Sequence, residues 1–196
     1  DLGEKGLAAL LGWVSRGGTL IALGESNWLL FAGATPPLQL RAQRQVLAEL
    51  PAWRRGDPAA AALQPITDDE DGWRRRFRPD GCILRADLDP THWLASGVGD
   101  RVPVMVQTDL ALECRLPAES VGRFAARDSL RLAGLLWPEA RDRWAGSSYL
   151  SREALGAGQV ISFLGNPWYR ASWPGSGRLL ANAVLLGPGL GTADQV

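Results

Sequence analysis

The chain has 196 residues, of which 46% are hydrophobic and 21% are charged. This composition is typical of one soluble globular domain over residues 1–196, and it excludes collagen-like, disordered and membrane-spanning chains. The 21 acidic and 21 basic residues cancel, so the charge gives no reason to expect a nucleic acid or an anionic membrane as a partner.

The first predicted elements are a helix over residues 4–14 and a buried strand over 19–23. Apolar residues recur at helical spacing before a Gly-Gly pair, and a short, partly branched apolar run follows. Loops at the carboxyl ends of strands in α/β sheets often carry ligand sites, so residues 24–31 form a candidate site. The alternative is a purely structural turn. The candidate binding residues in this loop are Glu25, Ser26, Asn27 and Trp28.

Residues 35–79 are predicted to form an irregular insertion. Prolines at positions 36, 37, 51, 58 and 65 interrupt the segment, and only residues 38–50 have the pattern of a helix. An acidic run at 68–71 lies close to three arginines at 74–76. These charges can pair locally or contact a partner, but exposed ion pairs contribute little and a solvated loop is the simpler interpretation.

The second half of the chain is predicted to be rich in strands. Alternating burial is expected over residues 82–88, and a glycine-rich turn at 156–158 joins two runs in a hairpin. A final helix over 176–186 is expected to begin with Ser176 as its N-cap and to end at Gly187, with its apolar side chains covering the sheet. The other predicted elements are strands at 102–107, 121–126, 132–137, 147–152 and 159–164, and a short helix at 138–144.

No metal or hydrolase motif is present. His92 is the one histidine, and Cys82 and Asp89 are near it in sequence, but there is no Cys-x-x-Cys or His-Glu-x-x-His pair. No Gly-x-Ser-x-Gly or Gly-x-Cys-x-Gly elbow occurs either. We therefore predict no catalytic residue and no metal site, with His92 as a hydrogen-bonded loop residue. Cys82 and Cys114 allow one disulfide but do not require it.

An aromatic segment near the C-terminus is a second candidate site. Trp168, Tyr169 and Trp173 fall within six residues, flanked by Asn166 and Arg170. Exposed aromatic rings can stack on sugars or anchor a protein partner, whereas buried rings would only pack in the core. Both interpretations remain open from the sequence.

Several segments of the chain resemble one known family. They are residues 132–139 (LAGLLWPE), 158–170 (GQVISFLGNPWYR), 177–187 (GRLLANAVLLG), 6–24 and 81–95. Together they resemble the C-terminal, class I glutamine amidotransferase-like domain of bacterial zinc carboxypeptidase-like proteins. The resemblance implies a flavodoxin-like α/β sheet, joined to a peptidase domain upstream on the same polypeptide. Zinc is expected only in that upstream domain, so no cofactor is expected in this chain.

The resemblance transfers no catalytic residue, because Cys82 opens a strand and no His-x-Glu follows it. It also implies that the first strand of the fold would lie before Asp1, which leaves a sheet edge for a partner domain to cover. Because such carboxypeptidase-like proteins are often exported, a periplasmic or extracellular location is expected, and a Cys82–Cys114 bridge would fit it.

Three hypotheses of function follow. The first is a noncatalytic accessory domain that packs against the peptidase domain, regulates it or positions its substrate. The second is a carbohydrate or cell-wall binding module that holds a peptide or glycan ligand with the aromatic cluster between Trp168 and Trp173. The third, motivated only by position, is a residual hydrolase that uses Glu25 or Ser26.

Overall fold

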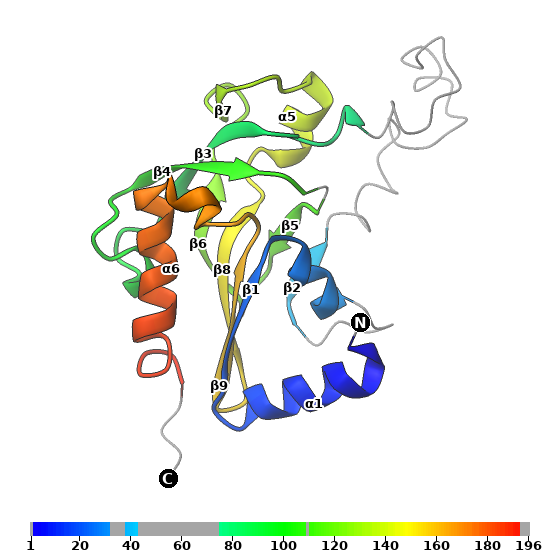
Figure 1. Ribbon diagram of the computed structural model, residues 1–196, viewed down its shortest axis with the longest axis vertical. Coiled ribbons are helices and arrows are strands. Elements are labelled where there is room, and N and C mark those ends of the chain that lie inside the picture. Colours follow the sequence, from blue (N-terminus) through cyan, green and yellow to red (C-terminus); the bar gives the residue numbers. More distant parts are fainter. Residues whose placement is uncertain (1, 32–37, 43–74, 109, 193–196) are drawn as a thin grey trace.

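A computed structural model describes residues 2–31, 38–42, 75–108 and 110–192. Helices lie near both ends of these residues, and most of the strands lie between them (Figure 1). In chain order they are α1 (Gly3–Ser15), β1 (Thr19–Leu23), the 3-10 helix η1 (Gly24–Phe31), β2 (Leu40–Ala42), β3 (Cys82–Leu88), the 3-10 turn η3 (Trp93–Ala95), β4 (Arg101–Val106), β5 (Leu112–Cys114), β6 (Glu119–Phe124), β7 (Arg131–Ala133), α5 (Pro138–Trp144), β8 (Ser148–Leu155), β9 (Gly158–Phe163), the 3-10 turn η4 (Tyr169–Ala171) and α6 (Pro174–Leu186).

The strands form one nine-stranded sheet with the central order β1-β9-β8-β6-β3-β4. In Figure 1, α6 lies on one side of the central strands, and α1 and η1 lie on the other. The α/β class predicted from the sequence is therefore confirmed. A flavodoxin-like sheet is mostly parallel. Among the described strands only β1 and β9 pair in parallel, and the other pairs are antiparallel.

The elements with strong local patterns lie where the sequence predicted them. The helix of α1, the strand β1 and the short helix α5 are confirmed, as is the hairpin of β8 and β9. In β3 every second residue is buried, and the outward-facing Arg85 and Asp87 form an ion pair with 2.8 Å between Nε and Oδ1. The alternation of apolar and polar residues in this segment therefore correctly predicted a strand with one buried face and one solvent-facing side.

The helix predicted over residues 38–50 is wrong in its described part. Residues 40–42 form β2, which pairs antiparallel with β5, a strand that the sequence patterns missed. The buried carboxylate of Glu153 accepts hydrogen bonds from the backbone N–H of Gln39 and Leu40, the shortest at 2.7 Å. These contacts from β8 hold the segment extended. The rest of 38–50 lies outside the described residues, as does most of the predicted insertion.

The strand predicted over 132–137 is also shorter than expected. Only Arg131–Ala133 is extended, as β7, and it pairs with β3 at two positions. All three residues of β7 are exposed. After Ala133 the apolar run leaves the sheet, and of its large side chains Leu136 is buried whereas Leu132, Leu135 and Trp137 are exposed.

The final helix begins two residues before the predicted N-cap. Ser176 lies inside α6 and is buried, where its hydroxyl donates to the carbonyl of Pro167 at 2.8 Å. Leu179 and Ala183 cover the sheet as expected, whereas Val184 is 54% exposed and Leu186 is 37% exposed. The last turn of α6 therefore points away from the core.

Polar contacts from the sheet and from η3 fix α6 in place. The buried amide of Gln159, in β9, donates to the carbonyls of Gly187 and Leu190 at 2.7 and 2.9 Å, and its oxygen accepts from Arg152. The amide of Asn182 donates to the carbonyls of Leu94 and Ser96, both at 2.9 Å. Buried side-chain amides with partners of this kind tie α6 and the turn after it to the sheet through Gln159 and to η3 through Asn182.

The core includes a group of aromatic rings. Phe124 contacts Trp144 and Tyr149 edge to face, and Tyr149 contacts Phe163 in the same way. Burial raises the pKa of Tyr149. Cys82 and Cys114 are both free thiols in this structure, so the disulfide that the sequence allowed is not formed. No described helix is long and apolar enough to cross a membrane.

Candidate functional site

The carboxyl ends of three strands, β1, β9 and β4, lie close together. β1 and β9 run in parallel, so the loops that follow Leu23 and Phe163 leave the sheet side by side. The end of β4 reaches the same place because Gly165 packs directly against it. A Cβ atom at residue 165 would lie 2.7 Å from the carbonyl oxygen of Met105. This close approach of two backbones requires glycine, and it brings distant parts of the chain together.

A pocket of about 250 Å³ lies at this meeting point. We call it the strand-end pocket. Its apolar lining includes Leu23, Met105 and Leu164, and its polar side chains come from all three strand ends. Those polar residues are Glu25 after β1, Gln107 and Thr108 after β4, and Asn166 and Tyr169 after β9.

The loop after β1 is held by its own side chains. The fully buried amide of Asn27 donates to the carbonyls of Gly24 and Phe163, both at 2.9 Å, and so joins the ends of β1 and β9. The hydroxyl of Ser26 accepts from the N–H of Leu23 and donates to its carbonyl, both at 2.8 Å. Ser26 and Asn27 therefore position the loop, whereas Glu25 is exposed and lines the pocket.

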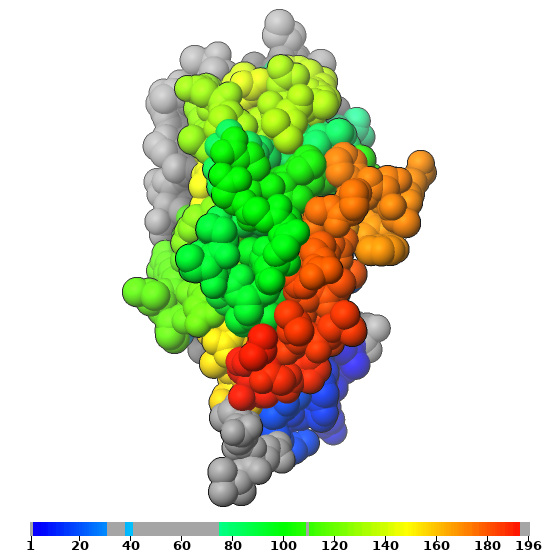
Figure 2. Space-filling model, turned by 90° about the vertical axis from the view of Figure 1, so that its left-hand side faces the viewer, coloured from blue at the N-terminus to red at the C-terminus, as the bar shows by residue number. Residues whose placement is uncertain are grey.

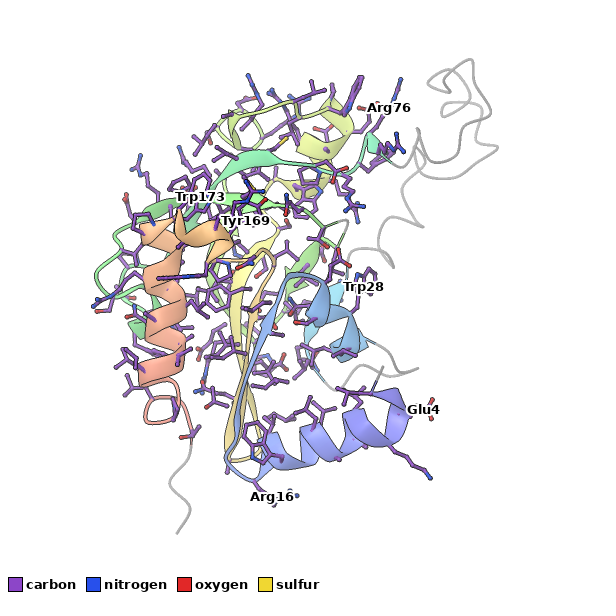
Figure 3. All side chains as sticks on the ribbon, in the orientation of Figure 1. Glu4, Arg16, Trp28, Arg76, Tyr169 and Trp173 are labelled. Atoms are coloured by element: carbon purple, nitrogen blue, oxygen red, sulfur yellow. The ribbon has the colours of Figure 1, made fainter. Side chains whose placement is uncertain are left out.

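The remaining candidate of this loop, Trp28, does not reach the pocket. Its half-buried ring packs against the core from η1. Figure 3 shows Trp28 well apart from Tyr169 and Trp173. The four adjacent candidates of the first loop thus have different tasks: one lines the pocket, two hold the loop, and one packs in the interior.

The aromatic segment is divided in a similar way. Tyr169 is half-buried and lines the pocket, and the guanidinium of Arg170 lies 5.3 Å from the centre of its ring. Trp168 is 56% exposed and lies on α6, where a Cβ at Gly177 would come within 2.7 Å of its ring. Trp173 is half-buried just before α6. The three rings therefore do not form one continuous exposed platform.

The backbone around Tyr169 has an uncommon conformation. Arg170 and Ala171 both have φ of 52°, in the left-handed region that non-glycine residues rarely adopt. Asn166 supports the start of this turn, because its side-chain oxygen accepts from the N–H of Trp168 at 3.0 Å. Asn166 lines the pocket, and its amide nitrogen has no hydrogen-bond partner among the described residues.

His92 and the two cysteines lie outside the strand-end pocket, in hydrogen-bonded or buried positions. His92 caps η3 by accepting from the N–H of Leu94 at 3.1 Å, and its Nε2 lies 3.1 Å from a carboxylate oxygen of Glu119, so the predicted hydrogen-bonded loop residue is confirmed. Burial raises the pKa of the Cys82 thiol and raises that of Cys114 to about 11. No group of three or more potential metal ligands occurs among the described residues.

Of the polar residues that line the pocket, the sequence predicts Glu25, Asn166 and Tyr169 as site residues but not Gln107 and Thr108. These two follow a strand that the sequence does predict. The rule that ligands bind at the carboxyl ends of strands would have applied to it equally. The sequence does not show that the end of β4 packs against Gly165.

Comparisons with known proteins assign no family. No family model and no curated protein matches the chain. The crystal structure of β-galactosidase from Bacillus circulans sp. alkalophilus is 13% identical, with a TM-score of 0.46, over 91% of this chain and 20% of that one. A cytoplasmic protein from Salmonella typhimurium is 16% identical, with a TM-score of 0.47, over 92% of this chain and 59% of that one. The chain spans less than two thirds of either structure, and no family membership follows from these distant likenesses.

Proposed function

We propose that the chain is a noncatalytic accessory domain of a zinc carboxypeptidase-like protein. In this proposal the domain is related to the class I glutamine amidotransferase-like domains, although its sheet is mostly antiparallel and not flavodoxin-like. It is exported with its parent, and it packs against the upstream peptidase domain. It regulates that domain or positions its substrate. The proposal rests on the resemblance of the segments described above and on one observation, which is an exposed apolar surface beside β7.

This β7 surface consists of Leu132, Leu135 and Trp137, which are 50%, 74% and 42% exposed. Figure 2 shows the segment around β7 and α5, in yellow-green, facing outward at the upper end of the molecule. The guanidinium of Arg76 lies 5.3 Å from the centre of the Trp137 ring. Large apolar side chains grouped at the surface mark interaction sites, and Trp and Arg are common among the residues that dominate binding. A protein domain is the partner that this surface fits best.

A pair of matched variants tests the docking. Leu135→Asp places a charge at the centre of the β7 surface, whereas Leu185→Asp places the same charge on α6 at a leucine that is 77% exposed. We expect Leu135→Asp to weaken the complex with the peptidase domain at least about tenfold, since charge at an interface core is strongly disfavoured. Titration calorimetry of the two separately produced domains measures it. Equal affinity of both variants and the unmodified chain would overturn the proposal.

Recognition of a peptide or glycan is the second candidate function, and the strand-end pocket favours it. One aromatic wall, one carboxylate and two side-chain amides converge there from separate parts of the chain. Concave sites with an apolar lining and a few convergent polar groups are typical of small-ligand binding. A recognition role is compatible with the accessory role, because a domain that positions a substrate must bind part of it.

A further inference from the structure

We propose that the strand-end pocket binds one neutral sugar residue. This inference rests on the second candidate function, glycan recognition, and it moves the binding site away from the exposed Trp168 to the pocket beside Tyr169. It also assigns Gln107 a part in binding.

The size and the walls of the pocket fit a single ring. Its volume of about 250 Å³ lies just below the range of pockets that hold drug-sized ligands, roughly 300 to 1,000 Å³. The ring of Tyr169 and the side chains of Leu23 and Met105 supply apolar surface. One face of a pyranose ring carries C–H groups that can pack on such surface, as they do on aromatic rings.

The polar side chains of the pocket match hydroxyl groups. The carboxylate of Glu25 only accepts hydrogen bonds, the amide nitrogen of Asn166 only donates, and the amide of Gln107 does both. Within the described part of the chain, none of these three groups has a side-chain hydrogen bond that would occupy it. Arg78 binds the main-chain carbonyl of Gln107 at 3.2 Å and leaves its side chain available. A sugar hydroxyl donates and accepts at once, so adjacent hydroxyls can satisfy all three side chains.

The charge of the pocket favours a neutral ligand. Glu25 is the single Asp, Glu, Lys or Arg in the lining that the structure describes. A phosphate or a carboxylate bound there would face the Glu25 carboxylate, which selects against anionic ligands. The two cations beside the lining already have partners, because Arg78 binds the Gln107 carbonyl and Asp80, and Arg170 lies on the Tyr169 ring. The pocket also needs little rearrangement to bind, because Asn27 and Gly165 already hold its three walls together.

The proposal is tested by titrating the full 196-residue chain, labelled with ¹⁵N, with glucose and N-acetylglucosamine. We expect the side-chain amide signals of Asn166 and Gln107 and the backbone signals of Gly24 and Gly165 to shift. The expected dissociation constant is on the order of millimolar, as for other ligands of this size. Glucuronate, which has a similar ring and a negative charge, should bind at least several-fold more weakly.

Matched variants locate the binding. Tyr169→Ala should weaken glucose binding at least about tenfold because the aromatic wall is lost, whereas Trp168→Ala should leave it unchanged. Glu25→Gln should reduce the preference for glucose over glucuronate, since the repulsion is removed. Glu4→Gln, which neutralises an exposed carboxylate on α1, should preserve that preference. Gln107→Ala, at an exposed side chain, repeats the affinity test if Tyr169→Ala does not fold.

Two results would overturn the proposal in different ways. Shifts confined to residues 168–173, with binding lost in Trp168→Ala and kept in Tyr169→Ala, would retain glycan recognition and eliminate the pocket as its site. No shift with either sugar at about 50 mM, well above the expected dissociation constant, would eliminate both. The accessory role would survive either result, because the β7 surface tests it separately.

Discussion

The segments around β9 and β7 look alike in sequence and end in opposite surroundings. Both contain apolar runs that predict strands. All six residues of β9 are buried, because β1 and β8 pair with it on its two edges and helices lie on both sides of the sheet. All three residues of β7 are exposed, and it pairs with β3 at two positions. Apolar composition alone does not distinguish a core strand from a surface that awaits a partner.

The largest expected difference between the two segments is in stability. Phe163→Ala removes a fully buried ring of β9 that contacts Tyr149, and we expect it to lower the free energy of unfolding by about 3–5 kcal/mol. Leu135→Ala, beside β7, should change it by less than about 0.5 kcal/mol. Urea denaturation of both variants measures this. Similar losses in the two variants would mean that the β7 segment packs in the core after all.

A smaller effect is expected for the polar contact between β9 and α6. Gln159→Ala leaves the carbonyls of Gly187 and Leu190 without their donor, which should cost about 1–3 kcal/mol. The exposed amide of Gln107 provides the control, because Gln107→Ala should change stability by less than about 0.5 kcal/mol. Amide hydrogen exchange in α6 should accelerate in the first variant and remain unchanged in the second. Equal exchange in both would contradict the anchoring role of Gln159.

The last expected effect is a change of stability with pH, caused by the half-buried thiol of Cys114. Burial raises the pKa of Cys114, in β5, from 9.0 to about 11. Between these values the unfolded chain loses the proton and the folded chain keeps it, so this contribution to stability is present below about pH 9 and is lost as the pH rises to about 11. We expect the unmodified chain to lose stability over that range by more than Cys114→Ala does. Parallel pH dependences in denaturation experiments would show that the thiol does not contribute.

The elements that the sequence predicted correctly are those with local signals. A helical period before a Gly-Gly pair marked α1, strict alternation marked β3, and a glycine turn marked the hairpin of β8 and β9. The strands β2 and β5 had no comparable signal. β2 depends on a carboxylate from residue 153, more than a hundred residues further along the chain, and no local pattern can contain such a contact.

The sequence predicted three of the five polar residues that line the strand-end pocket. The rule about strand ends led to Glu25, Asn166 and Tyr169, and these do line one pocket. The same rule could not separate Glu25 from Ser26 and Asn27, because the difference lies in hydrogen bonds that depend on the folded backbone. The rule also covers Gln107 and Thr108, which follow β4, but the sequence does not show that the end of β4 lies beside the end of β9.

The contact between Gly165 and Met105 also sets limits on redesign. Any side chain at residue 165 would meet a backbone oxygen, which cannot rotate away as a flexible side chain would. A library made to select new ligands should therefore keep this position invariant and randomise residues 25 and 107, whose exposed side chains hold no part of the main chain, whereas Asn166 supports the turn before Trp168. In natural variants with other ligand preferences, we expect Gly165 to be kept and the exposed side chains of the pocket lining to differ.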